Sequence, residues 1–194
     1  MRFKDLVKKN RSYRRFKSGV LIKRDFLEEL VQVSRFTPSS RNLQPLRYYL
    51  AFNKKQCDSI FQCLGWAKNL RNWKGPEKNK KPSAYIVILF DKKRAQELGS
   101  NVNFDVGISA QTMLLAAAVK GYCGCMLASV NKVKLTRSLN ISDKLEIALV
   151  VALGKKGERI VLEDIDKNQD TMYYRDNQDI HHVPKIVKKD LIIN

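Results

Sequence analysis

Two arginines and a serine stand together near the start of the chain, in Arg11-Ser12-Tyr13-Arg14. A guanidinium offers a rigid fork of N–H donors and a hydroxyl adds another, so this combination suits a phosphate monoester. The same residues could instead form a solvated basic face, which is the commoner role of an isolated run of charge. The segment therefore predicts either a phosphate site or an exposed basic strip.

A second polar stretch, residues 38–45 with the sequence PSSRNLQP, lies between two apolar segments. Its two prolines fix backbone torsions, while the serines, Asn42 and Gln44 present donors and acceptors in a preset loop. Such a loop either recognises a polar ligand or makes an ordinary turn.

The net charge is +18, from 37 basic and 19 acidic residues among 194. This excess attracts anions: a nucleotide phosphate, a polyanion such as RNA, or an acidic surface. Basic residues interleaved with Trp66 and Trp73 in residues 65–82 could stack on bases, so nucleic-acid binding is one hypothesis. The two tryptophans could equally cover a substrate pocket or pack inside the fold. Because lysines are spread through every segment, charge alone does not choose between these functions.

The cysteines and histidines do not form a metal-binding pattern. Cys123 and Cys125 are two apart on a predicted strand, so both side chains face one way. A metal would need further ligands of matching type, and nothing in the sequence brings His181 and His182 near them. We expect the cysteines to be small, buried, reduced residues that turnover does not need, and we expect no metal site. The histidine pair is expected to order the C-terminal segment.

These residues must be positioned by a core, and the pattern of apolar residues predicts its elements. Residues 84–90, 122–129 and 145–153 read as buried strands, and residues 46–52 as an aromatic-rich strand. Helices are expected over residues 1–9, 25–36, 54–64, 104–119 and 132–139. After residue 157 the chain turns polar and is expected to be irregular. The length and the lack of a composition break favour a single domain over 1–194, and the charged N-terminus favours a soluble cytoplasmic protein.

The helix over residues 104–119 is the centre of this arrangement. From Met113 to Val119 it has no polar side chain, and a helix that is apolar all round is buried on all sides. It is therefore a core helix, either within one chain or shared between two subunits. Its apolar run is judged too short and too interrupted for a membrane span.

Taken in their order along the sequence, the motifs resemble those of the nitroreductase family of FMN-dependent oxidoreductases, and the resemblance covers nearly the whole chain. The matching stretches are Arg11-Ser12-Tyr13-Arg14-Arg15-Phe16, Pro38-Ser39-Ser40-x-Asn42-x-Gln44-Pro45, Asp105-Val106-Gly107, Gly121-Tyr122-Cys123-Gly124-Cys125-Met126, Leu153-Gly154-Lys155 and His181-His182-Val183-Pro184-Lys185. Each motif alone is weak evidence for the resemblance, but together they occur in the order that the family has. The chain departs from the family pattern at Asn10, Leu46 and Ile186.

The resemblance implies an α+β fold with a mostly antiparallel central sheet flanked by helices, in an intertwined homodimer with FMN at the interface. NADH or NADPH would pass hydride to flavin N5 and leave, and an electron-poor acceptor such as a nitroaromatic or quinone would then take the electrons, a ping-pong mechanism. No acid–base triad is needed, because the cofactor carries the chemistry. A relative with specialised flavin chemistry, such as dehalogenation, and a polyanion-binding protein are the alternatives.

The resemblance also assigns roles to single residues. Arg11, Ser12 and Arg14 would hold the FMN phosphate and ribityl chain, and Lys185 would join them from the C-terminal end. The partner's loop would line the flavin ring, and the backbone at the end of the second buried strand, residues 122–129, would face its reactive edge. The residues concerned are Pro38, Ser39, Ser40, Asn42 and Gln44 in the loop, and Leu127, Ala128 and Ser129 at the end of the strand.

Overall fold

The computed structural model describes residues 2–67, 69–70 and 73–194. Its centre is a four-stranded antiparallel sheet in the order β1-β2-β4-β3. The strands are β1 (Leu46–Ala51), β2 (Ala84–Asp91), β3 (Cys123–Leu127) and β4 (Leu145–Gly154). The four strands predicted from the sequence are thus confirmed, and the two most apolar ones lie in the middle of the sheet.

The two central strands explain why the sheet forms. The first six residues of β2 are all buried, and so are the last five of β4. A strand that is buried on both faces needs a continuous apolar run rather than alternation, and both sequences provide one. Val87 and Val150 face each other in the register between them. Residues on the two faces belong to two separate apolar clusters.

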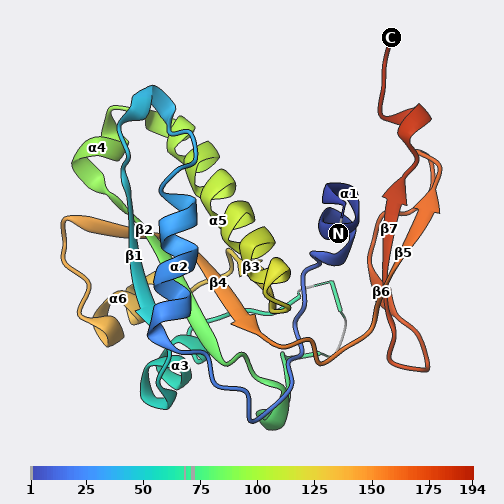
Figure 1. Cartoon of the computed structure of the whole chain (residues 1–194), viewed down its shortest axis with the longest axis horizontal. Coiled ribbons are helices and arrows are strands. Elements are labelled where there is room, and N and C mark those ends of the chain that lie inside the picture. Colours follow the sequence, from blue (N-terminus) through green and yellow to red (C-terminus); the bar gives the residue numbers. More distant parts are fainter. Residues whose placement is uncertain (1, 68, 71–72) are drawn as a thin grey trace.

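Helices cover both faces of this sheet (Figure 1). On one face lie α2 (Arg24–Ser34) and α5 (Val102–Val119), and on the other lie α3 (Lys54–Phe61) and α6 (Lys132–Leu139). The N-terminal helix α1 (Phe3–Lys9) contacts α5. A short helix that the sequence analysis did not predict, α4 (Lys92–Gln96), follows β2, and Asp91 caps it by accepting from the backbone of Lys93.

The central helix α5 is buried along one face only. Met113 and Ala117 are fully buried against the sheet, whereas Phe104 is 67% exposed and Ile108 is 39% exposed. One chain therefore does not bury this helix on all sides. Contrary to the sequence-based judgement, residues 99–119 are long and apolar enough for a membrane span by length and composition alone. Half of that window is buried inside the fold, as in a core helix.

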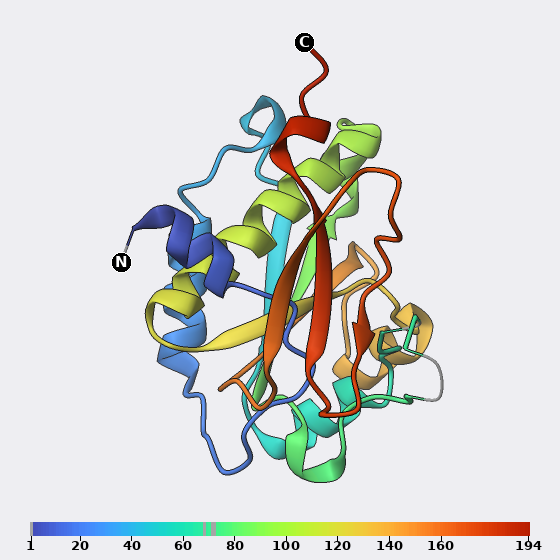
Figure 2. The ribbon, with the colours of Figure 1, turned by 90° about the vertical axis from the view of Figure 1, so that its right-hand side faces the viewer.

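The expectation of an irregular C-terminal region is wrong. The region forms a three-stranded sheet in the order β5-β7-β6, with β5 (Ile160–Ile165) parallel and β6 (Tyr174–Arg175) antiparallel to β7 (His181–Ile186). This small sheet covers one side of the molecule next to α1 (Figure 2). Its strands mix charged and apolar residues and are mostly half-buried, so they lack the apolar run or alternation that reveals a strand.

Polar contacts around His182 tie the small sheet together. The Nδ1 atom of His182 lies 2.5 Å from Glu163 of β5, and Nε2 lies 3.0 Å from Asp176, which follows β6. The ring of Tyr174 stacks on the His182 ring at 4.7 Å. The predicted ordering role of the histidine pair therefore has a structural basis at this position.

Candidate functional site

The arginine-rich segment runs extended along the edge of the central sheet. Ser12 pairs with Gly124 of β3, and the backbone N–H of Tyr13 donates to the Gly124 carbonyl at 3.1 Å. Glycine is required at position 124 by space, because a Cβ there would lie 2.1 Å from the carbonyl oxygen of Ala152. The segment is thus fixed against β3 by backbone pairing, which sets the positions of the arginines on either side.

The side chain of Arg11 is partly buried and lines a small cavity. Its Nη2 donates to the Val7 carbonyl at 2.7 Å, and its Nε is buried and has no partner among the described residues. The cavity measures about 220 Å³ and is lined by Asn10, Arg11, Ser12, Gln111, Leu114 and Met126. Burial lowers the pKa of the Arg11 guanidinium. An anion in this cavity would lie next to the charge of Arg11 and the hydroxyl of Ser12.

Arg14 points toward the small sheet. Its Nη1 lies 3.3 Å from the Ser12 carbonyl and 3.4 Å from Nε2 of His181, and its guanidinium lies 4.9 Å from the centre of the Tyr173 ring. Burial, followed by the charge of Arg14, lowers the pKa of His181 to about 4, so His181 is neutral at neutral pH. Neutral His181 can accept the Arg14 hydrogen bond through Nε2.

Glu158 joins this segment to the C-terminal region. Its Oε1 accepts from the backbone N–H groups of Arg14 and Arg15, at 2.5 and 3.0 Å, and its Oε2 pairs with Arg175 at 2.7 Å. The side chains of Glu158 and Arg175 are 2% and 12% exposed. Arg15 is itself bound by Glu77 and Asp179, each within 2.7 Å. The sequence analysis missed Glu158, which lies in a polar stretch without a motif.

The loop of residues 38–45 is anchored to the first turn of α5 by a buried carboxylate. Asp105 is 3% exposed and accepts from Ser39 Oγ at 2.6 Å and from both the backbone N–H and Oγ of Ser40 at 2.8 Å. Ser39 Oγ in turn accepts from the backbone N–H of Gln44 at 3.0 Å. Asp105 was quoted only as part of a motif, although one signal for its role was present: it is the only charge in residues 104–119.

The same loop has an unusual backbone. Arg41, Asn42 and Gln44 have φ values of 52°, 54° and 48°, a region that non-glycine residues adopt at some energetic cost. Asn42 and Gln44 are exposed, and their side chains hydrogen-bond each other at 3.1 Å. A cavity of about 360 Å³ lies beside Pro38 and Ser39. The loop therefore presents polar groups in one fixed conformation, as a binding edge requires.

The remaining candidate residues are more scattered. Leu127 is buried at the end of β3, Ala128 is exposed, and the Ser129 carbonyl accepts from Gly65 at 2.8 Å. Lys185 is exposed on β7, four residues beyond His181. Four residues of strand span about 13 Å, and among the described residues no hydrogen bond joins Lys185 to Arg14.

The structure thus brings some candidates together and keeps others apart. Arg11, Ser12 and Arg14 form one group, and the loop of residues 38–45 forms another. Asp105 and Leu114, which contact the loop and the Arg11 cavity, are nine residues apart on α5, or about 13 Å along the helix axis. Within one chain these two groups are therefore separate from each other along α5.

Trp66 and Trp73 were expected either to cover a pocket, to stack on bases or to pack, and the structure separates the two. Trp66 is 6% exposed within the core on the α3 face, so it packs and cannot stack on a base. Trp73 is half-buried; its ring lies 5.7 Å from the Arg15 guanidinium and 4.6 Å from that of Arg175, and it lines a cavity of about 520 Å³. Of residues 65–82, residues 68 and 71–72 lie outside the described residues.

Cys123 and Cys125 face one way into the core, as predicted. Burial raises the pKa of each thiol to about 12, so both are protonated at neutral pH and are poor nucleophiles.

Comparison with known proteins gives a consistent result. The model of the nitroreductase family matches residues 7–155. A Bacillus subtilis (strain 168) protein named NAD(P)H nitroreductase MhqN is 22% identical over 79% of this chain and 88% of its own length. A nitroreductase family protein of Clostridium novyi NT covers 95% of both chains, with a TM-score of 0.64 and 20% identity. A nitroreductase of Exiguobacterium sibiricum 255-15, solved in complex with FMN, has a TM-score of 0.66 and 17% identity over 81% of this chain and 90% of its own.

Proposed function

Because this chain belongs to the nitroreductase family, we propose that it is an FMN-dependent NAD(P)H oxidoreductase that reduces an electron-poor acceptor such as a nitroaromatic or a quinone. The names of its relatives support this proposal, since one is an NAD(P)H nitroreductase and another was solved with FMN. The observation that carries it is that Arg11 and Ser12 line one cavity, and that the only hydrogen bond of the Arg11 side chain among the described residues is to the Val7 carbonyl. This donor set fits the phosphate of FMN.

The roles of this chain's residues follow from their positions. Arg11 and Ser12 would hold the phosphate, and Arg14 would bind next to them while keeping its contact with His181. Bound FMN would relay hydride from NAD(P)H to the acceptor in two separate half-reactions. The chain would contribute binding and orientation, with no protein acid or base required.

We further propose a homodimer in which each site takes residues 38–45 from the partner subunit. One observation supports it: Phe104 and Ile108 expose an apolar stripe on α5, the helix to which the loop is anchored through Asp105. A second copy would cover the stripe and bring its loop toward this chain's arginines. All 194 residues act as one domain in this arrangement.

The test of FMN binding is a titration followed by quenching of flavin fluorescence. We expect Arg11→Ala to weaken FMN binding by about one to two orders of magnitude, because a charge-assisted hydrogen bond contributes about 1.5–3 kcal/mol. Arg11→Lys should recover part of the loss. Arg24→Ala is the matched control, since Arg24 is an exposed arginine on α2 that pairs with Glu28. Equal FMN affinity in all four proteins would exclude Arg11 from the site.

The dimer is tested by light scattering at micromolar concentration. The wild-type protein should have twice the chain mass of 22.4 kDa, and Ile108→Glu should shift it toward the monomer. A wild-type protein at 22.4 kDa would refute the shared site while leaving FMN binding to be judged by the titration.

A further inference from the structure

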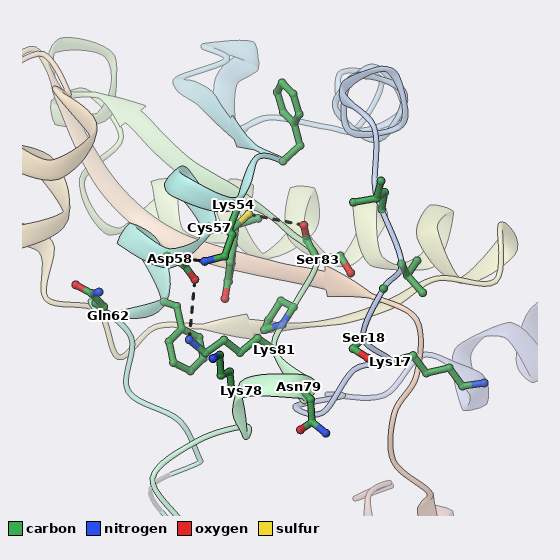
Figure 3. A pocket seen from close by; sticks show the side chains of 17 residues that line it. Lys17, Ser18, Lys54, Cys57, Asp58, Gln62, Lys78, Asn79, Lys81 and Ser83 are labelled. Atoms are coloured by element: carbon green, nitrogen blue, oxygen red, sulfur yellow. Dashed lines mark hydrogen bonds and ion pairs between the residues drawn. The ribbon is translucent and has the colours of Figure 1, made fainter.

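A separate cavity of about 600 Å³ opens at the end of the central sheet where β1 finishes and β2 begins (Figure 3). Its walls are the segment of residues 17–21, helix α3, and residues 78–83. None of the residues assigned above to the flavin lines it. Its volume is within the range of small-molecule sites, about 300–1,000 Å³. The cavity is therefore large enough for a ligand of its own.

Apolar side chains form much of its wall. Phe52 and Phe61 are half-buried, Tyr85 is 1% exposed, and Leu21 is 85% exposed. Leu21 belongs to the segment that follows Gly19, whose φ is 72°. Aromatic rings next to an accessible aliphatic side chain offer a surface for a flat apolar group.

The α3 side of the cavity has an excess of positive charge. Lys54, Lys78 and Lys81 lie together beside Asp58, whereas Lys17 points away from them (Figure 3). Lys54 hydrogen-bonds Asp58, and Lys81 Nζ lies 4.0 Å from the same carboxylate and 4.1 Å from the centre of the Phe61 ring.

Lys78 has no carboxylate within 4 Å among the described residues. The hydrogen bond from Lys54 keeps the pKa of Asp58 below its usual value, so Asp58 stays ionised and offsets one of three positive charges. An anion placed here would relieve the repulsion that remains.

Three polar side chains around the cavity are also available to hydrogen-bond a ligand. Ser18, Gln62 and Asn79 line it, and within the part of the chain that the structure describes their side chains make no hydrogen bond. Ligand sites combine an apolar lining with a few available polar groups in this way.

We propose that this cavity binds a small organic anion with a flat apolar body, whose carboxylate or phosphate meets Lys78 and Lys81 and whose apolar part packs on Phe52 and Phe61. The site is distinct from the residues assigned to the flavin, so this inference does not depend on the proposed function. The cavity would give the protein a second ligand of a definite chemical class.

The first experiment is calorimetric titration of the purified protein with 8-anilinonaphthalene-1-sulfonate, an aromatic anion. We expect the double variant Lys78→Ala, Lys81→Ala to weaken this binding about fivefold, because solvent screens the contribution of each of these two charges. Binding of neutral N-phenyl-1-naphthylamine should change less than about twofold, since it has no charge to lose.

The matched control is Lys92→Ala, Lys93→Ala. It removes the same charge from α4, beyond the opposite end of β2. Equal loss in the two double variants would mean that overall charge, not this cavity, attracts the anion, and would overturn the proposal.

The second experiment places the ligand in the cavity. Cys57 lines it and is partly exposed, whereas Cys63, Cys123 and Cys125 are buried. Burial raises the pKa of Cys57 to about 11, so alkylation by iodoacetamide is followed at about pH 9 by peptide mass spectrometry. A saturating concentration of the aromatic anion should slow alkylation of Cys57 severalfold. An unchanged rate at saturation would refute binding in this cavity.

Competition then distinguishes the two headgroups. Benzoate or phenyl phosphate should weaken the apparent binding of the sulfonate in the calorimetric titration while Cys57 stays protected from alkylation, and the stronger competitor identifies whether the site prefers a carboxylate or a phosphate. Failure of both to compete would overturn the assignment of an organic anion.

Discussion

Six consecutive residues of β2 in the central sheet are buried, whereas every residue of β5 in the small sheet is at least partly exposed. The first sheet is held by apolar side chains on both faces, and the second by ion pairs around His182 and Glu158. The two sheets should therefore respond differently to mutation, salt and pH. Apolar burial depends little on ionic strength, while partly exposed ion pairs weaken with salt and with titration.

The largest expected effect tests the connection between the two regions. Glu158→Ala removes the close partner of buried Arg175, leaving only its 3.9 Å pair with Asp179, and frees the backbone N–H groups of Arg14 and Arg15. We expect a loss of about 3–5 kcal/mol, as for other buried ion pairs broken on one side, measured by urea unfolding. The control Glu163→Ala removes a more exposed carboxylate from β5 and should cost less than about 1 kcal/mol. Equal losses of unfolding free energy in the two variants would contradict the role of Glu158 in joining the N-terminal segment to the C-terminal region.

The next largest effect tests whether apolar burial alone stabilises the central sheet. Met113 is fully buried between α5 and the sheet, so Met113→Ala should cost about 2–5 kcal/mol through lost burial and the cavity left behind. The loss should be the same in 0.05 M and 1 M sodium chloride, because no charge is involved. A loss that varied strongly with salt would show that electrostatics contributes to the central core as well.

A smaller effect concerns the loop of residues 38–45, whose anchor is polar but belongs to the central region. Asp105→Asn should lose at least one of the hydrogen bonds to Ser39 and Ser40, at about 1–3 kcal/mol, and should speed tryptic cleavage after exposed Arg41 severalfold. Ser109→Ala, one turn along α5, removes a buried hydroxyl bonded to Ser34 and is the matched control. Cleavage accelerated equally in both variants would indicate general loosening rather than loss of an anchor.

The smallest effect is the pH response of the small sheet. Hydrogen bonds to Asp176 and then Glu163 raise the pKa of folded His182 above its usual value. Their stabilisation is fully present below the unfolded pKa of about 6.5 and is lost as pH rises through the raised folded value. Toward acid it persists until pH falls through the pKa of Asp176, which the hydrogen bond from His182 lowers.

Amide exchange can measure this response. Protection factors of β7 should fall a few-fold on the alkaline side, while those of β2 stay constant, because the backbone hydrogen bond from Arg94 lowers the pKa of Asp91, the carboxylate of β2, which therefore stays ionised there. His182→Gln should remove the dependence. A parallel change in both sheets would show that they unfold as one unit.

Prediction from the sequence succeeded where burial leaves a periodic pattern. The continuous apolar runs of β2 and β4 and the amphipathic α2 were identified because each pattern directly reflects packing. Strands β5 to β7 were missed, because ion pairs hold them and charged residues can pair over any sequence separation. Asp179, for example, pairs with Arg15 from 164 residues away.

The candidate site shows the same limit. Spacing identified Arg11, Ser12 and the loop around Asn42, since short motifs keep chemical groups together along the chain. The structure was needed to show that Arg14 faces His181 and that Asp105 fastens the loop. The 13 Å estimated between the two groups along α5 could not be obtained from motifs at all.

The three positive φ values in the loop of residues 38–45 have a consequence for the timing of recognition. Each costs about 1–3 kcal/mol and persists because the hydrogen bonds to Asp105 hold the loop in this shape. This ordering is completed when the chain folds, before any ligand or second subunit arrives. When a ligand or a second subunit binds, the loop itself loses little conformational entropy. More of the contact energy therefore remains as affinity.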